Sequence, residues 1–245
     1  MSGLACSVLR RRVPDELSLT IDCVVAARNE AETVASVVEV CRSCSFVREV
    51  IVVDDGSTDA TAELAAAAGA KVVRRDVGDG RGGSKAHAME AGVAASDAPW
   101  ILFVDADLVG VEPRHLDAIC RPAVEGRAAM SLGTFDYGFW NWLVLRLPPT
   151  TGERIIPRWV FDAIPPYKRD GYTIEIMINE VVCEGRLPIV ARVMDGVTHR
   201  TKREKFGPLE GWRRTWRMFR ELWSLWGVVR WRTYWFYLRD LVIDR

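Results

Sequence analysis

Two hydrophobic patterns alternate along the first 130 residues. Short apolar runs rich in β-branched residues predict buried strands at 19–27, 49–55, 70–75 and 100–106. Alanine-rich stretches with helical spacing follow the first three strands, at 30–43, 59–69 and 84–96, and the second ends on Gly69. Repeated strand and helix units with apolar strands predict an α/β fold, in which helices cover both faces of a mostly parallel sheet.

The pattern changes beyond residue 130. A fifth strand is predicted at 128–135, and the aromatic and proline-rich stretch 136–159 has no clear period. A helix of about 12 to 14 residues is predicted within 170–186, followed by a short strand within 188–196. Because repeats and low-complexity linkers are absent, we expect one domain over 1–205 and a C-terminal extension over 206–245.

The extension is rich in tryptophan and arginine and holds six of the ten tryptophans. Its aromatic residues are spaced by four and three positions, which places them on one stripe of a helix with the arginines largely off it. The stripe comprises Trp212, Trp216, Phe219, Trp223 and Trp226. Such a helix suits a membrane interface, with contact over 212–237, but packing on the domain or on a second subunit of a homodimer is favoured equally.

Charge separates the extension from the rest of the chain. The whole sequence has 33 Lys and Arg against 33 Asp and Glu, yet 200–245 has twelve basic against five acidic residues. We therefore expect an anionic partner for the extension only, and no nucleic acid.

The N-terminus and the cysteines indicate the compartment. The apolar stretch before Arg10 is too short for a secretory signal, and no segment reaches the roughly 18 apolar residues that span a bilayer. We expect a cytoplasmic protein, on the inner face of the membrane if the extension binds lipid. The six cysteines fit that compartment as reduced thiols, and a structural role is favoured for Cys41 and Cys44 over zinc or redox work.

Polar clusters follow the predicted strands: ARNE at 27–30, DDGSTD at 54–59 and DAD at 105–107. Ligands of parallel sheets bind at the carboxyl ends of strands, so these clusters are candidate binding groups. Asp55 can accept hydrogen bonds from a nucleobase or ribose. The alternative is that Ser57 and Asp59 merely cap the next helix.

A glycine-rich loop precedes Ser84 and Lys85. Its composition resembles a phosphate-binding loop, but the spacing of Gly78, Gly80, Gly82 and Gly83 does not match the P-loop pattern. Lys85 either faces a diphosphate or belongs to a plain surface turn.

Asp105 and Asp107 are the sharpest chemical feature. Residues two apart at an extended strand end point to the same side, so both carboxylates can face one crevice. Their repulsion is removed by a divalent cation that bridges to a diphosphate. The pattern therefore favours a metal site over a solvated loop.

The ordered set VVAARNEAETV, EVIVVDDGSTDAT, SKAHAMEAG and ILFVDADL resembles the nucleotide-binding half of family-2-type glycosyltransferases of the GT-A fold, over 19–110. The resemblance implies a UDP- or GDP-sugar as donor and Mg²⁺ or Mn²⁺ as cofactor. It assigns nucleoside contacts to Ala27, Arg28, Glu30 and Asp55, and the diphosphate to Lys85. It also places Asp105 on the nucleotide side of the metal and makes Asp107 its direct ligand.

The acceptor half, 111–205, resembles polyprenyl-phosphate glycosyltransferases and glucosyl-3-phosphoglycerate synthases. The residues that carry this are TGERIIPRWVFDAIPPYKRDGYTIEIMIN followed by GVTHR. The resemblance implies that His199 completes the metal shell, whereas His87 and His115 are expected to be structural or solvated. An imidazole beside two carboxylates suits Mn²⁺ better than Mg²⁺.

Besides Asp107, the candidate catalytic residues are Glu153, Arg154 and Glu175. If the acceptor is a hydroxyl, Glu153 or Glu175 could be its general base. If the acceptor is a phosphate, Arg154 would orient it through two hydrogen bonds. Glu175 could equally be a first-turn acid that stabilises its helix.

These features predict a metal-dependent glycosyltransferase whose acceptor is a membrane lipid phosphate such as polyprenyl phosphate, with a small soluble acceptor such as 3-phosphoglycerate as the alternative. A sugar nucleotidyltransferase is less favoured, because the glycine-rich basic loop typical of that class is absent after the first strand. A non-catalytic nucleotide-sugar-binding protein is disfavoured by the intact Asp105, Asp107 and Lys85.

Overall fold

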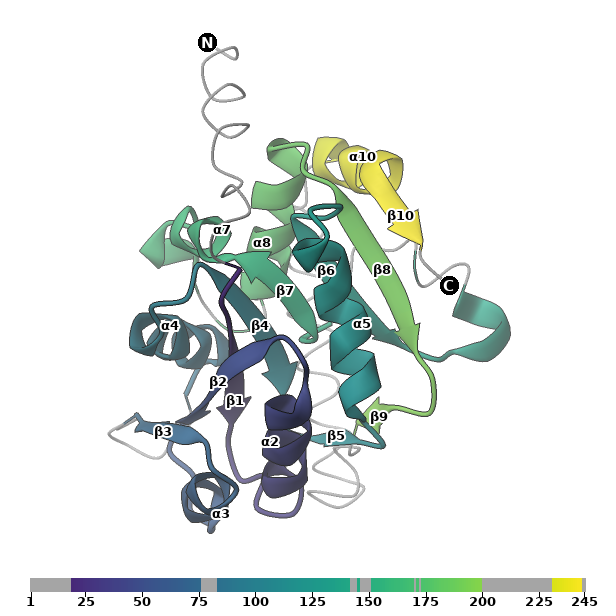
Figure 1. Ribbon diagram of the computed structural model, residues 1–245. Coiled ribbons are helices and arrows are strands. Elements are labelled where there is room, and N and C mark those ends of the chain that lie inside the picture. Colours follow the sequence, from purple (N-terminus) through teal and green to yellow (C-terminus); the bar gives the residue numbers. More distant parts are fainter. Residues whose placement is uncertain are drawn as a thin grey trace, which may run out of the picture.

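The computed structural model describes residues 19–75, 83–141, 145, 151–169, 171, 173–199 and 231–243. Within these, eight strands form one sheet in the order β10-β8-β6-β7-β4-β1-β2-β3 (Figure 1). Every neighbouring pair is parallel except the two that involve β7. The expected mostly parallel α/β sheet is therefore confirmed.

The strands that the apolar runs predicted are all present. They are β1 (Ile21–Ala27), β2 (Val47–Asp54), β3 (Lys71–Arg74), β4 (Trp100–Asp105), β6 (Met130–Phe135) and β8 (Ile189–Met194). The residues of β1 and β4 are almost all buried, because helices cover both faces of the sheet.

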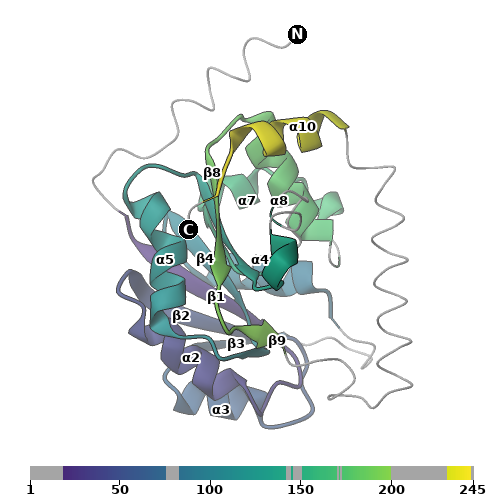
Figure 2. The same ribbon diagram turned by 90° about the vertical axis from the view of Figure 1, so that its right-hand side faces the viewer.

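The helices form two layers, one on each side of the sheet (Figure 2). On one face lie α2 (Val34–Ser43), α3 (Thr61–Ala67) and α5 (Pro113–Val124). On the other lie α4 (Lys85–Ala95), α7 (Arg158–Asp162), α8 (Thr173–Glu184) and α10 (Trp231–Asp240). Short 3₁₀ turns occupy η1 (Gly138–Trp140) and η2 (Pro166–Lys168). Each layer thus encloses a separate apolar core against the sheet.

One strand, β7 (Arg154–Pro157), lies in the stretch where the sequence shows no clear period. It runs antiparallel between β4 and β6 and pairs Phe103 with Arg154. Only four residues long and ending in proline, it leaves no strand-like pattern in the sequence. Its orientation nevertheless brings its first residue to the edge of the sheet where β4 ends.

The C-terminal extension differs in part from the expected helix. Helix α10 is helical as predicted, but β10 (Leu241–Ile243) is a strand that pairs in parallel with β8 and extends the sheet. Phe236 and Tyr237 of α10 are buried, and α10 packs on α8. Of the membrane, the domain and a second subunit, it is the domain on which Phe236 and Tyr237 pack. The aromatic stripe 212–226 lies outside the described residues and remains a prediction.

Two sequence-based expectations concern the membrane and the thiols. Of the helices in the described part of the chain, none combines the length and apolarity needed to cross a bilayer. The five cysteines described are free and buried, and Cys41 and Cys44 belong to the core between α2 and the sheet.

Candidate active site

The carboxyl ends of the central parallel strands meet at one edge of the sheet. The register pairs Ala26 with Asp105 across β1 and β4, and Ala27 with Asp54 across β1 and β2. The ARNE, DDGSTD and DAD clusters consequently lie side by side. Because β7 is antiparallel, Glu153 and Arg154 reach the same edge from the opposite direction.

A second, two-stranded sheet brings His199 to the DAD turn. It consists of β5 (Leu108–Val109) and β9 (Thr198–His199) and pairs Leu108 with His199. The Nδ1 atom of His199 lies 3.2 Å from Oδ1 of Asp107. One ligand atom each from Asp105, Asp107 and His199 lie within 4.8 Å of one another.

Two glycines allow this short sheet to form. A Cβ atom at Gly110 would lie 2.6 Å from the carbonyl oxygen of Gly196, and both residues have positive φ angles, +77° and +74°. A side chain at Gly110 would separate the two turns, whereas at Gly196, where a Cβ would meet no atom of the described residues, it is the positive φ that favours glycine. The contact between Asp107 and a residue 92 positions later therefore depends on backbone that only glycine adopts readily.

The donor set fits a divalent cation. Two carboxylates and an imidazole match the ligands that Mn²⁺ accepts, and both carboxylates are partly shielded from solvent. Burial lowers the pKa of His199, but the hydrogen bond to Asp107 and the nearby carboxylates outweigh it and raise the pKa above its ordinary value. The ring of Phe135, with centroids 4.1 Å apart, packs against the imidazole and restricts its orientation.

Lys85 lies between two carboxylates at the start of α4. Its Nζ atom is 2.7 Å from Oδ1 of Asp105 and 2.8 Å from Oε1 of Glu175. Burial lowers the pKa of Lys85, but the two carboxylates outweigh it and raise the pKa well above the usual value. Lys85 is thus a fixed cation beside the candidate metal ligands. Glu175, on α8, is bound to Lys85 and does not act merely as a helix-terminal acid.

Glu153 is fully buried beside this cluster. The hydroxyl of Thr151 donates to its Oε2 atom, whereas Oε1 has no hydrogen-bond partner among the described residues. Burial, and then the charge of Asp105, raises the pKa of Glu153 to about 7. A carboxyl group with this pKa can exchange a proton near neutral pH, as a general base must.

Arg154, the expected acceptor-binding residue, has several hydrogen bonds within the protein. Its side chain is fully buried. It donates to the Thr151 carbonyl at 3.0 and 2.5 Å, to the Glu175 carbonyl at 3.2 Å and to Oδ1 of Asn179 at 2.9 Å. These bonds face α8 and the preceding turn. Arg154 thus ties the 151–154 turn to α8.

Sequence reasoning missed Gly152, which lies between these groups. A Cβ atom there would lie 2.4 Å from both carboxylate oxygens of Asp105. Glycine is therefore required for the turn to approach Asp105 so closely. A glycine just before two candidate residues was a signal, but its purpose depends on a contact 47 positions away in the chain.

The nucleoside candidates form a neighbouring cluster around Asp55. Asp55 is buried and pairs with the guanidinium of Arg75, and Arg28 acts on it electrostatically. Burial raises the pKa of Asp55 even though both arginines oppose the shift. A Cβ atom at Gly83 would lie 1.8 Å from Oδ2 of Asp55, so the glycine-rich loop ends against this carboxylate. Arg75 was not among the sequence candidates, although it directly follows β3.

The ARNE and DDGSTD turns are tied together by hydrogen bonds. Asn29, at φ 55°, donates its N–H to Oγ of Ser57 and accepts the Thr58 N–H at 2.8 Å. The N–H of Glu30 donates to the Thr61 hydroxyl at 2.9 Å. Asp59 accepts the N–H of Thr61, the first residue of α3, so the capping alternative holds for Asp59. Asp55 does not take part in this bond and belongs to the candidate nucleoside cluster.

The other two histidines are not part of the metal-ligand cluster, although His87 lies close enough to Asp55 for the two groups to interact electrostatically. His87 is exposed on α4. His115 accepts the Glu112 N–H at 3.0 Å through Nδ1 and caps the start of α5.

Comparison with known proteins places this site in a family. The model of glycosyl transferase family 2 matches residues 22–180, which is more than half of the chain and includes every strand that contributes to the site except β9. The chain belongs to glycosyl transferase family 2. The recognition made from the ordered strand-end clusters is therefore confirmed.

Among relatives in this family, glucosyl-3-phosphoglycerate synthase of Mycolicibacterium smegmatis is 39% identical over 112 residues, covering 42% of this chain and 36% of the relative. Glycosyltransferase AglJ of Haloferax volcanii is 44% identical over 79 residues, covering 32% of this chain and 24% of the relative. These alignments thus span about a third or less of either relative.

Solved structures of family members cover more of the chain. Glucosyl-3-phosphoglycerate synthase from Mycobacterium tuberculosis in complex with Mg²⁺ and UDP has a TM-score of 0.63 and 26% identity, over 82% of this chain and 77% of that one. A complex of the same enzyme with Mn²⁺, UDP and glucosyl-3-phosphoglycerate has a TM-score of 0.61 and 26% identity, over 74% and 72%. The GT-A fold is confirmed, and these relatives bind the two cations that the sequence predicted.

Proposed function

We propose that this protein transfers a sugar from a nucleoside diphosphate sugar, such as UDP-glucose, to a small phosphorylated acceptor such as 3-phosphoglycerate. The observation that carries the proposal is the meeting of Asp105, Asp107 and His199 beside Lys85. Relatives with the same fold bind UDP-glucose with Mn²⁺ and phosphoglyceric acid. The sequence favoured a lipid phosphate acceptor, but the comparisons support the soluble alternative better.

The proposal assigns the cation to Asp105, Asp107 and His199. A bound Mn²⁺ or Mg²⁺ supplies positive charge to the diphosphate, whose negative charge grows as the sugar leaves. Lys85 contributes a second, permanent charge at the same place. Its two carboxylate contacts hold the ammonium in position before any substrate binds, so little reorganisation is needed during transfer.

Arg28, Asp55 and Arg75 are assigned to the nucleoside. The Asp55 carboxylate can accept hydrogen bonds from a base or ribose, and its ion pair with Arg75 fixes its direction. This cluster lies at the ends of β1, β2 and β3, on the opposite side of β4 from the acceptor half. Donor and acceptor would therefore approach Asp105 from opposite sides.

Glu153 is assigned to the acceptor hydroxyl. Oε1 of Glu153 carries no hydrogen bond within the described residues, and the pKa of about 7 lets the group take a proton at neutral pH. Glu175 is engaged by Lys85, which makes it a group that positions the ammonium. Arg154 holds the turn that carries Glu153.

A lipid phosphate remains the second candidate acceptor. The Trp- and Arg-rich composition of 212–237 favours it. One relative, of Staphylococcus aureus, is named 4,4'-diaponeurosporenoate glycosyltransferase, and the acceptor in that name is a carboxylate, so it does not support a phosphate. That relative is 40% identical over 92 residues, 24% of its own length.

The test is a transfer assay with purified protein, Mn²⁺, and UDP- or GDP-sugars. The acceptors are 3-phosphoglycerate, glycerol 3-phosphate and polyprenyl phosphate in detergent, and products are identified by mass spectrometry. We expect a glycosylated phosphoglycerate that requires a divalent cation. Product with polyprenyl phosphate alone would replace the proposed acceptor by the lipid, and no product from any nucleotide sugar would overturn the proposed activity.

A further inference from the structure

The C-terminal helix reaches toward the acceptor side of the site through one buried side chain. Tyr237 of α10 is 2% exposed, and its hydroxyl donates to the carbonyl oxygen of Leu145 at 3.1 Å. Leu145 is itself buried and belongs to the connection between β6 and β7. The bond thus joins α10 to a buried residue between β6 and β7, 92 positions away.

Helix α10 is held firmly enough to act as an anchor. The guanidinium of Arg186 lies 4.6 Å from the ring centroid of Phe236, and β10 continues directly from α10 into the sheet beside β8. Helix α10 also packs on α8, the helix that carries Glu175 and Asn179. A hydroxyl fixed on such a support has little freedom, so its hydrogen bond can define the position of the Leu145 backbone.

The turn that precedes β7 is held by Arg154. The guanidinium binds the Thr151 carbonyl and, on α8, the Glu175 carbonyl and Asn179. Tyr237 lies close enough to Arg154 for the two groups to interact electrostatically. In this turn, Gly152 approaches the Asp105 carboxylate and Glu153 is buried. Arg154 therefore joins this turn to α8, and Tyr237 of α10 lies within electrostatic range of the same guanidinium.

We propose that Tyr237 is a positioning residue for the acceptor side of the site, acting through the packing of α10 on α8 and through Arg154 on the turn that carries Glu153. The inference rests on the proposed function for its effect on substrate. We expect the effect on the acceptor side because Tyr237 lies on the half of the molecule that contains β7, β6, β8 and β10. The nucleoside cluster lies on the other half, at the ends of β1, β2 and β3. The C-terminal extension is then part of the site's framework.

The test is Tyr237→Phe, which removes the hydroxyl and keeps the ring. The matched control is Tyr167→Phe, the same chemical change at a tyrosine that is 84% exposed on η2. We expect Tyr237→Phe to raise the acceptor KM about fivefold, the factor that corresponds to one lost buried hydrogen bond, with the donor KM unchanged. Equal acceptor KM values in the two variants, or an equal rise in both KM values for Tyr237→Phe, would overturn the proposal.

Hydrogen–deuterium exchange tests the positioning without any substrate. In Tyr237→Phe, peptides that contain Leu145 and peptides that cover 151–157 should exchange faster than in the wild type, while peptides that cover 21–27 should not change. Unchanged exchange at 151–157 would overturn the proposal even if the KM values shifted. If the wild-type protein transfers no sugar at all, the proposed function fails, and the exchange comparison still decides whether Tyr237 positions the turn.

Discussion

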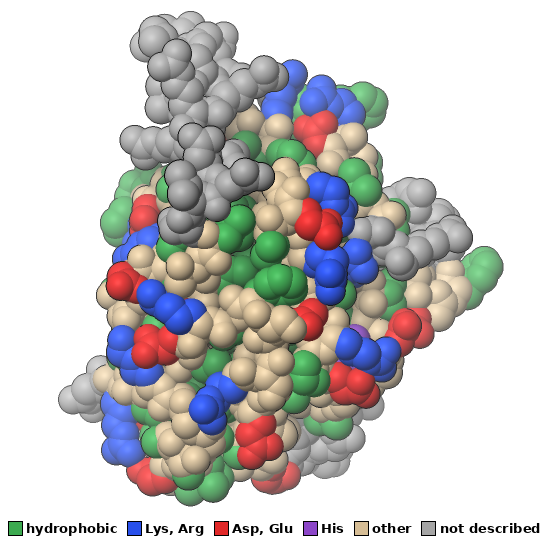
Figure 3. Space-filling model, in the orientation of Figure 1, with side chains coloured by type: hydrophobic (Ala, Val, Ile, Leu, Met, Phe, Trp, Pro, Cys, Tyr) green, Lys and Arg blue, Asp and Glu red, His purple; other side chains and the backbone are tan. Residues whose placement is uncertain are grey.

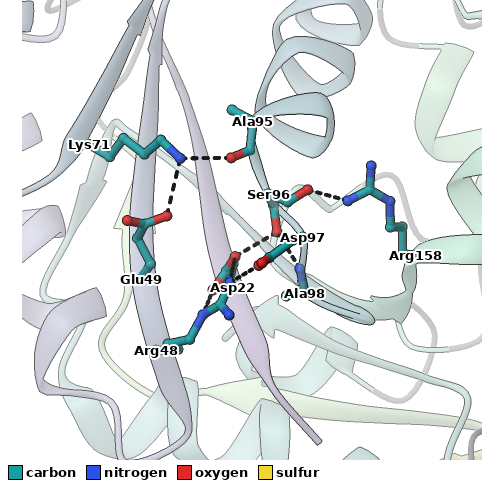
Figure 4. A network of polar contacts seen from close by, with 9 residues as sticks. All are labelled: Asp22, Arg48, Glu49, Lys71, Ala95, Ser96, Asp97, Ala98 and Arg158. Carbon is teal, nitrogen blue, oxygen red and sulfur yellow. Dashed lines mark hydrogen bonds and ion pairs between the residues drawn. The ribbon is translucent and has the colours of Figure 1, made fainter. Parts of the chain in front are cut away.

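The two ends of the central sheet each hold buried carboxylates, but these differ in how fully they are paired with basic groups and hydrogen-bond donors. At the amino end, Asp22 of β1 is fully buried and accepts two bonds from Arg48, at 2.9 and 2.7 Å, and one from the hydroxyl of Ser96 at 2.6 Å (Figure 4). Arg48 also pairs with Asp97, and Arg158 donates to the Ser96 carbonyl. Around Asp22, charge and hydrogen bonds are matched.

At the carboxyl end, acids accumulate. Among the described residues, four carboxylates lie with three basic side chains: Asp105, Asp107, Glu153 and Glu175 with Lys85, Arg154 and His199. Oε1 of Glu153 has no hydrogen-bond partner among the described residues, and the pKa of Glu153 rises to about 7.

The difference separates stability from binding. A buried acid with all its partners holds elements of the fold together, whereas a cluster of acids with too little positive charge lowers stability unless a cation or substrate supplies the rest. The space-filling view of Figure 3 shows the usual pattern at the surface, where Lys and Arg are interspersed with Asp and Glu. On this face of the molecule the acids are therefore not gathered as they are at the site.

The largest expected effect comes from removing the ammonium group of Lys85 at the carboxyl end of the sheet. Lys85→Met should reduce transfer about 10²- to 10³-fold, because the leaving diphosphate loses a fixed positive charge. The measurement is kcat/KM from UDP release, with circular dichroism to check the fold. A rate within about threefold of the wild type would contradict the role of Lys85, since such a loss corresponds to less than about 1 kcal/mol of transition-state stabilisation.

Replacing a basic residue by methionine at the amino end should lower stability and leave the transfer rate unchanged. Arg48→Met leaves Asp22 buried without its cation and should lower the free energy of unfolding by about 2–3 kcal/mol, less than for a fully buried pair because Arg48 is half-exposed. Transfer should stay unchanged in conditions where the protein is folded. Urea unfolding checks the stability, with Arg114→Met, at an exposed pair with Glu112, as the control. Loss of activity without loss of stability would remove the distinction between the two ends.

A smaller effect is expected at Gly152. In Gly152→Ala the new Cβ would lie 2.4 Å from the Asp105 oxygens, so the turn or the carboxylate must move, and Mn²⁺ affinity should fall about tenfold. Gly185→Ala is the control, because a Cβ there comes no closer than 3.2 Å to another atom. Equal affinities in the two variants would show that the approach of Gly152 does not matter for the metal ligands.

The sequence predicted the parts of this architecture that depend on local pattern. The apolar runs of β1, β2 and β4 and the polar residues that follow them are visible in the chain, and parallel pairing then requires that those residues meet. The strand β7 was missed because Arg154–Pro157 has too few residues to show alternation, and β10 because it directly follows the helical pattern of α10.

Contacts between distant turns were harder to predict. His199 was expected at the metal site from a family resemblance, but the pairing of β5 with β9 and the approach of Gly110 to Gly196 that bring it there follow from no local spacing. Arg154 was expected to bind an acceptor, which stays a prediction, but its burial against α8 was not foreseen. Its position depends on the direction of β7, which the sequence did not show.

The central claim is that the acids of the carboxyl end form a cation site. The direct test is Mn²⁺ binding in the presence of saturating UDP, measured by isothermal titration calorimetry on the wild type, Asp107→Asn and Asp97→Asn. Asp97 is an exposed acid of the amino-end network and serves as the matched control. We predict one Mn²⁺ site with the same Kd in the wild type and Asp97→Asn, and a Kd at least about tenfold higher in Asp107→Asn. Equal Mn²⁺ affinity in all three proteins would contradict the account.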